Sequence, residues 1–157
     1  MRHRGFTIVE LVVTVGIIAL LATAAVPSAQ LLYQRQRESE LRAALRTIRA
    51  ALDAYKAASD AGRIKKSLDK TGYPPDLQSL ADGVEDASSA KEGVKIYFLR
   101  RVPRDPFWPD ATTPAAETWG LRSYASPPDD PQPGDDVYDV HSRSSRTGLN
   151  GVPYHDW

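Results

Sequence analysis

The 157-residue chain contains no cysteine, which excludes disulfide bonds and metal sites built on cysteine. It carries no net charge either, because 20 Lys and Arg residues balance 20 Asp and Glu residues. A chain without a basic excess does not indicate nucleic-acid binding, so we expect no nucleic-acid partner.

Sequence motifs of the common enzyme classes are missing as well. The chain has no nucleophile elbow, no phosphate-binding loop and no zinc-ligand spacing. Asp139, His141 and Ser142 have the side chains of a hydrolytic triad, but neighbouring residues on a strand point to opposite faces. We therefore predict that the protein is not an enzyme.

What the chain does have is one long apolar run near its start. Residues 11–26 (LVVTVGIIALLATAAV), with the apolar residues just before them, approach the ~20 residues that span a bilayer core as a helix. Arg2, His3 and Arg4 precede the run, and basic residues favour the cytoplasmic side. We predict one membrane-spanning helix with the rest of the chain outside the cytoplasm. A secretory signal peptide, cut near ATAAVPSAQ, is the alternative.

A single acid, Glu10, lies at the front of this apolar run. A carboxylate at the centre of a membrane helix costs about 2.5 kcal/mol or more, and less near an end, so such residues are functional candidates. The surrounding residues 4–11 (RGFTIVEL) resemble the leader junction of type IV pilins and type II secretion pseudopilins. That resemblance implies that a prepilin peptidase cuts between Gly5 and Phe6 and then methylates the new amino group of Phe6.

The resemblance also implies a role for the carboxylate. In a filament the apolar helices pack together, and Glu10 of one subunit would pair with the amine of Phe6 on a neighbour. A buried charge is less costly when it is paired and hydrogen-bonded, and such a pair can fix the register of assembly. Pro27 removes one helical hydrogen bond, so we expect a kink there, which fits a role in assembly and a purely local bend equally.

The residues after Pro27 follow the pattern of an amphipathic helix. An apolar residue recurs every three or four positions and draws one stripe along the helix, formed by Leu41, Leu45, Ile48, Leu52 and Tyr55. This stripe should pack against the sheet of a head, and Gly62 should end the helix.

Charge is divided unevenly between this stem and the rest of the chain. Residues 28–66 carry nine Lys and Arg against four Asp and Glu, a net charge of +5, whereas residues 67–157 carry nine against fifteen, a net charge of −6. We hypothesise that stem arginines pair with the acidic turn of a neighbouring subunit, and two solvated faces are the alternative. The residues concerned are Arg35, Arg42, Arg46 and Arg49 on the stem and Asp129, Asp130, Asp135 and Asp136 in the turn.

The remaining residues predict a small head. Asp76 should cap a short helix over residues 77–84, and the polar residues 85–93 should be mobile. Residues 94–102 are a short strand or an extended segment. Residues 119–124 and 137–142 alternate in polarity and should be antiparallel strands, joined by a turn rich in Pro and Asp. The fold class is therefore α+β and pilin-like, a long N-terminal helix packed on a small antiparallel sheet.

We divide the chain into a leader peptide (1–5), a transmembrane and polymerisation helix (6–29), an amphipathic stem helix (30–66) and a periplasmic head (67–157). The head resembles the major pseudopilin branch of type II secretion in four places. These are Tyr73-Pro74, Pro103–Phe107 (PRDPF), Tyr138–Ser142 (YDVHS) and the position of Trp157.

The resemblance implies a structural subunit of a periplasmic pseudopilus that drives protein export by type II secretion. Its partners would be identical and related pilin-like subunits, the prepilin peptidase, an inner-membrane assembly platform and the lipid bilayer. Two alternatives stay open: a subunit, major or minor, of a type IV pilus, and a solitary anchored binding domain.

The same branch binds calcium in its last loop, so the resemblance implies a calcium site there. Calcium needs six to eight oxygen ligands, usually including several carboxylates. The loop offers Asn150, Asp156 and backbone carbonyls, but Arg143 and Arg146 stand where acids would help. Calcium is therefore the one cofactor considered, and the residues leave its presence open.

Overall fold

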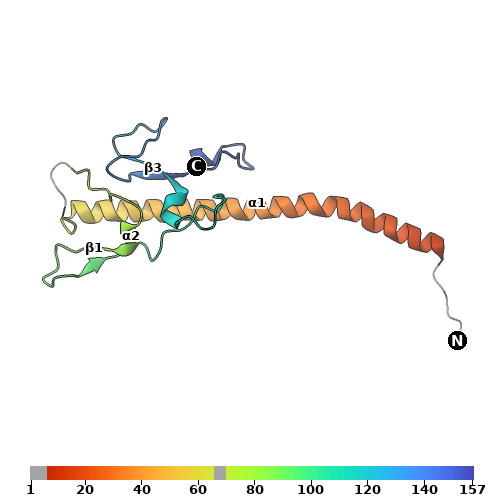
Figure 1. The fold of residues 1–157 in the computed structure, drawn as a ribbon, viewed down its shortest axis with the longest axis horizontal. Helices are drawn as coiled ribbons and strands as arrows, with labels where there is room; N and C mark the ends of the chain where they lie inside the picture. The colour runs from red at the N-terminus through yellow and green to blue at the C-terminus, as the bar shows by residue number, and fades with distance from the viewer. Residues whose placement is uncertain (1–6, 66–69) are drawn as a thin grey trace. The chain divides into compact units, whose positions relative to one another are not determined.

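The computed structural model describes residues 7–65 and 70–157, with the backbone alone described for residues 24–27. Its longest element is helix α1, Ile8–Asp60 (Figure 1). The chain divides by its contacts into two compact units, one ending at Gln36 and the other covering Arg37–Trp157. The boundary predicted at residues 29 and 30 falls inside α1, and the second half of this helix belongs to the same compact unit as the head.

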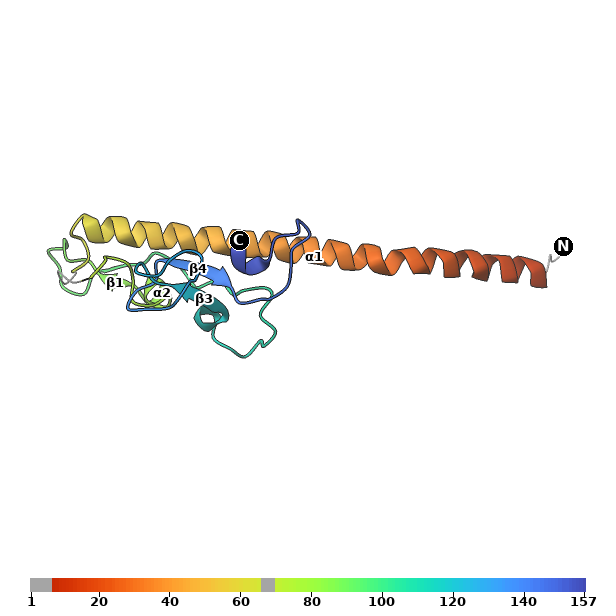
Figure 2. The ribbon, with the colours of Figure 1, turned by 90° about the horizontal axis from the view of Figure 1, so that it is seen from above.

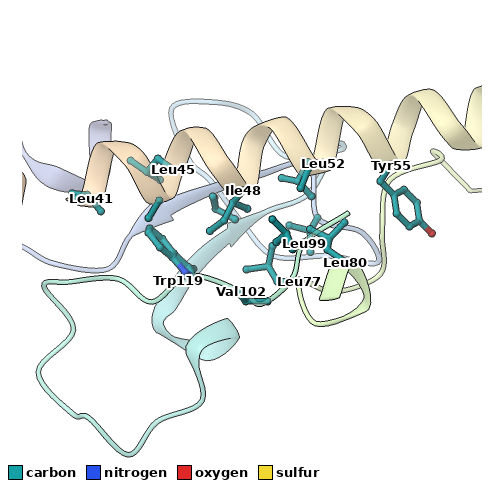
Figure 3. Close-up of a cluster of buried hydrophobic side chains, with 14 of the residues drawn as sticks. Leu41, Leu45, Ile48, Leu52, Tyr55, Leu77, Leu80, Leu99, Val102 and Trp119 are labelled. Atoms are coloured by element: carbon teal, nitrogen blue, oxygen red, sulfur yellow. The ribbon is translucent and has the colours of Figure 1, made fainter. Parts of the chain in front are cut away.

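The predicted apolar stripe forms the core of the second unit. All five of its side chains are buried, and Leu41 and Ile48 have no exposed surface. Figure 3 shows Ile48 and Leu52 on the side of α1 that faces Leu77, Leu80 and Leu99, and Leu45 near Trp119. Fully burying one large apolar side chain stabilises a fold by roughly 1.5–3 kcal/mol, so this stripe anchors the head to the helix.

Glycine ends α1 where the sequence predicts it. Gly62 has a φ of +72°, a backbone conformation that side chains rarely adopt. The N–H of Arg63 donates to the carbonyl of Ala58 at 2.9 Å, and the N–H of Gly62 donates to Ser59 at 3.0 Å. These bonds satisfy carbonyls at the end of the helix. The helix therefore ends at Asp60, six residues before the end of the predicted stem range 30–66.

Short elements and loops cover one side of this half of α1 (Figure 2). Helix α2 is Ser79–Asp82, within the predicted range 77–84 but shorter. As predicted, Asp76 holds its start, because its Oδ1 accepts the N–H of Ser79 at 2.7 Å. Two 3-10 helices follow later in the chain, η1 at Ala115–Thr118 and η2 at Tyr154–Asp156.

The sheet is smaller than the predicted strands suggest. Strand β3 (Trp119–Arg122) pairs antiparallel with β4 (Asp139–Ser142), in a register that places Trp119 opposite Ser142. The two strands and their direction confirm the prediction, although each is shorter than expected. Because four-residue strands cover little surface, loop residues such as Val102 complete the core that packs on α1.

A second antiparallel pair flanks the polar residues 85–93, whose predicted mobility stays a prediction. Strand β1 (Val84–Glu85) pairs with β2 (Lys95–Ile96), and β2 lies in the segment 94–102, for which a strand was one of the two expected conformations. Asp86 Oδ2 lies 2.7 Å from the guanidinium of Arg63, and its N–H donates to the carbonyl of Val94 at 2.8 Å. These contacts tie the loop to the end of α1, which a local sequence pattern cannot reveal.

Candidate functional site: the start of helix α1 and the loops of the head

The first turn of α1 explains part of the predicted junction. Thr7 Oγ1 accepts the N–H of Glu10 at 3.2 Å, and the Thr7 carbonyl accepts the N–H of Leu11 at 3.1 Å. Thr and Glu three residues apart are the pattern of a capping box, and an acid in the first turn also opposes the positive end of the helix dipole. Glu10 therefore has a local role at the helix start, which its Thr-x-x-Glu spacing could have indicated from sequence.

The first half of α1 presents apolar side chains without burying them. From Thr7 to Thr23 every side chain is exposed, and an 18-residue window of the helix has a mean hydropathy of 2.4. Ile8, Leu20 and Ile18 expose 83%, 72% and 65% of their surface. An apolar surface of this extent is unfavourable in water, so this half fits single-pass membrane anchoring and packing against other apolar helices.

Polar groups within this apolar half are satisfied by the helix itself. Thr14 Oγ1 donates to the carbonyls of Glu10 and Leu11, both at 2.9 Å, and Thr23 Oγ1 donates to Leu20 at 2.7 Å. Such bonds remove the penalty of a free hydroxyl in a lipid environment. Gly16 has open space around the position of a Cβ, so nothing in the described chain requires glycine there.

Several predicted site residues cannot be placed. Gly5 and Phe6, the expected cleavage and methylation positions, lie outside the described residues. The side chain of Pro27 lies outside them as well. The backbone continues as helix through position 27, and the kink expected there stays a prediction.

The Pro-x-Asp-Pro segment of the head has a structural explanation. Asp105, which is 1% exposed, accepts the N–H of Phe107 at 2.7 Å through Oδ1 and the hydroxyl of Ser142 at 2.6 Å through Oδ2. Its own N–H donates to Thr118 Oγ1 at 3.1 Å. One buried residue therefore joins three parts of the head: its carboxylate contacts the loop and the end of β4, and its backbone N–H contacts η1.

The triad-like residues do not form a catalytic site. Ser142 has no exposed surface and donates to Asp105, whereas Asp139 pairs with Arg49 of α1. Desolvation on burial lowers the pKa of His141, whose ring lies over Gly120 of β3. The three side chains alternate across β4 as the sequence predicts.

The residues of the last loop do not fit the expected calcium ion. Asn150 Oδ1 accepts the N–H of Val152 at 3.1 Å, and Asp156 Oδ1 lies 3.2 Å from the imidazole of His155. Within residues 7–65 and 70–157, no three His, Cys, Asp or Glu side chains are grouped to hold a metal. Calcium needs six to eight oxygen ligands, and this loop does not gather them.

Comparisons with known proteins agree on one family. A family model, the prokaryotic N-terminal methylation motif, matches residues 1–26. The chain is 30% identical over 113 residues to type II secretion system core protein G of Klebsiella pneumoniae, across 69% of this chain and 72% of that protein. It is 29% identical over 109 residues to type II secretion system core protein G of Pseudomonas aeruginosa, across 68% and 69% of the two chains. No solved structure matches.

Proposed function

Because the chain belongs to the family of type II secretion system core protein G, we propose that it is a structural subunit of a periplasmic pseudopilus that assembles by helix packing and drives protein export. The observation that carries the proposal is the exposed apolar half of α1. Such a surface needs either lipid or the same surface of neighbouring subunits. In this proposal the protein has a structural role and not a catalytic one.

The match to the methylation motif supports a maturation step in this proposal. Prepilin peptidase cuts between Gly5 and Phe6 and methylates the amine of Phe6, while the apolar helix holds the chain in the inner membrane with the head in the periplasm. An inner-membrane platform then adds the subunit to a filament of identical and related subunits.

Glu10 has two roles in this proposal. Within one chain it lies in the capped first turn of α1. Between chains its carboxylate pairs with the methylated amine of Phe6 on a neighbour, since each charge is costly alone among apolar helices and much less costly when paired. The pair would fix the register at which one helix stops beside the next.

A type IV pilus subunit is the alternative that the leader alone allows. The methylation motif does not distinguish it from a pseudopilin, whereas both relatives described above are secretion-system core proteins. We therefore propose the pseudopilus rather than the pilus.

Intact-mass and N-terminal peptide analysis of the protein from membranes of a host with its prepilin peptidase tests the proposal. The expected mature chain starts at Phe6 and carries one added methyl group. A chain starting near Gln30 would mean that an ordinary signal peptidase removed the apolar run, and the pseudopilus proposal would be wrong. Gly5→Ala provides the control, because it should leave the leader attached without changing the helix.

A further inference from the structure

The buried carboxylate of Glu38 on α1 accepts hydrogen bonds from residues near the C-terminal end of the chain. Glu38 is 4% exposed, although acids on this helix otherwise face solvent, as Glu40 does. Its Oε1 accepts the N–H of Leu149 at 2.8 Å and the hydroxyl of Tyr154 at 3.0 Å. A buried carboxylate without hydrogen-bond donors is strongly unfavourable, so these bonds balance the removal of Glu38 from water.

The two groups that donate to Glu38 lie in the loop of residues 143–157, which is buried at Gly148 and Tyr154 and mostly exposed elsewhere. Tyr154 has no exposed surface; its ring stacks on Phe107 at 4.1 Å and meets the edge of Trp157 at 5.0 Å. A Cβ added at Gly148 would lie 2.5 Å from Trp157 and 2.7 Å from Asn150 Oδ1. The loop is therefore closely packed around Gly148, Tyr154 and Trp157, and Glu38 bonds to it at two points.

Two further side chains of α1 hold the last residue of this loop. Arg49 Nη2 donates to the carbonyl of Trp157 at 2.9 Å, and the guanidinium of Arg42 lies over the Trp157 ring at 4.2 Å. Positions 38, 42 and 49 are separated by four and seven residues, so they share one face of a helix. The helix thus contacts the loop through an anion and two cations.

Three of the oxygen atoms that could face a cation already accept hydrogen bonds inside the loop. Asn150 Oδ1 accepts the N–H of Val152, the carbonyl of Val152 accepts the N–H of Gly148 at 2.9 Å, and the carbonyl of Arg146 accepts the N–H of Tyr154 at 3.0 Å. Arg143 and Arg146 add positive charge to the same segment, which opposes a divalent cation.

From these contacts we propose that Glu38 is the residue that closes the loop 143–157 onto α1, and that this closure needs no calcium. Hydrogen bonds to one helix carboxylate gather the loop, in place of a cation that would gather carboxylates and carbonyls from within it. This inference concerns the head of one subunit, so it stands or fails independently of the pseudopilus proposal.

Hydrogen exchange of the full-length protein in detergent tests the closure. Glu38→Ala should speed exchange of the amides in residues 143–157 about tenfold, equivalent to about 1.4 kcal/mol of local opening, and leave the β1–β2 pair unchanged. Glu38→Gln keeps an acceptor oxygen and should have a smaller effect. Glu40→Ala, an exposed acid on the same helix, is the matched control.

The proposal would be wrong if Glu38→Ala and Glu40→Ala changed the exchange of residues 143–157 equally, or if neither variant changed it. Should Glu38→Ala fail to fold, Tyr154→Phe removes a single hydroxyl and keeps the packed ring. It should still speed exchange in residues 143–157 relative to β1–β2, and unchanged exchange there would contradict the proposal.

A separate measurement tests the proposal that closure of the loop 143–157 needs no calcium. Thermal unfolding and loop exchange of the wild-type chain are compared in chelator and in about 1 mM calcium chloride, the weak end of the range for extracellular calcium sites. We expect no difference in either, because a ligand stabilises a fold only when it binds the folded state. A calcium-dependent rise in Tm or slower exchange in residues 143–157 would refute calcium-independent closure.

Discussion

Arg49 of helix α1 and Asp139 of strand β4 form an ion pair, with 2.7 Å between Nε and Oδ1. Nη2 of the same guanidinium donates to the carbonyls of Val140 at 3.1 Å and Trp157 at 2.9 Å. One side chain therefore joins the helix, the sheet and the last residue of the loop. A planar group with several fixed donors can serve these acceptors together, whereas an ammonium cannot.

Arg49→Lys should lower the stability of the head even though it keeps the charge. We expect a loss of about 1 kcal/mol, because two carbonyls lose their donor while the partly exposed ion pair itself contributes little. Thermal unfolding of the full chain, compared with Arg46→Lys, measures this. An equal Tm for the two variants would show that the hydrogen bonds from Arg49 to Val140 and Trp157 do not contribute to stability.

Removing the Asp105 carboxylate should be more damaging. Asp105→Ala leaves the Phe107 N–H and the fully buried Ser142 hydroxyl without their acceptor, and each such loss costs about 1–3 kcal/mol. Ser142→Ala removes one of the two bonds to Asp105, together with the longer bond of 3.1 Å that its hydroxyl accepts from the N–H of Ser144, and should cost less. Denaturant unfolding of both variants checks the order, and a larger loss for Ser142→Ala would contradict it.

The two roles of Glu10 can be separated by three substitutions. Glu10→Gln keeps a side chain that suits the first turn but removes the charge, so it should be processed and inserted normally yet fail to assemble, as Glu10→Ala should. Thr7→Val removes the capping oxygen, costs the helix about 0.5–2 kcal/mol and should still assemble. Electron microscopy shows whether each variant forms filaments. Normal filaments from Glu10→Gln would refute the pairing of Glu10 with the amine of Phe6 on a neighbour.

Asp86 predicts a contribution to stability that depends on pH. The hydrogen bond from Arg63, followed by that from Ser88, lowers the pKa of Asp86 from 3.8 to about 2. A carboxyl whose pKa is lower in the folded state stabilises the fold above pH 4 and loses this contribution as the pH falls toward 2. The Tm of Asp86→Asn should therefore fall less than that of the wild type between pH 4 and pH 2. Parallel curves would contradict the prediction.

The structure reduces the number of charged residues that are suitable for testing stem–head pairing between subunits. Arg42 and Arg49 contact residues of their own head, and the buried Asp136 accepts bonds from Thr71 and the N–H of Tyr124. Reversing those charges would damage the head itself. In the described part of the chain, Arg46 and Asp129 are exposed and have no partner, so they remain suitable for a test.

Arg46→Glu should weaken assembly slightly, and adding Asp129→Lys in the same chain should partly restore it. A single exposed pair contributes only about 0–1 kcal/mol, but it repeats along a filament, and salt should reduce its effect. Filament yield at low and high salt measures both effects, with Arg46→Gln as the uncharged control. If Asp129→Lys does not restore the filament yield, or if the yield does not depend on salt, these charges do not pair between subunits and only keep the head soluble.

Features set by residues close together in sequence could be predicted. The stripe from Leu41 to Tyr55 depends only on helical periodicity, the end of α1 depends on Gly62, and the start of α2 depends on Asp76. Each is fixed within a few residues of chain, so local propensity and packing agree.

Features that join distant segments could not be predicted. Glu38 looks like any exposed helix acid until Leu149 and Tyr154 are placed against it, more than 100 residues later in the chain. The residue that follows β1 likewise finds its partner at a distance, because Asp86 pairs with Arg63 at the end of α1. The polarity of a loop does not reveal which of its charges find partners.

Strands β3 and β4 place Gly120 directly opposite His141, and the imidazole occupies the space above the glycine. A Cβ at position 120 would lie within 2.6 Å of three atoms of that ring, so the imidazole would have to leave before any side chain could enter. A side chain at position 120 therefore requires a change in the conformation or the identity of residue 141. Among related chains we therefore expect the two positions to vary together, a glycine accompanying a ring and a larger residue accompanying a small partner.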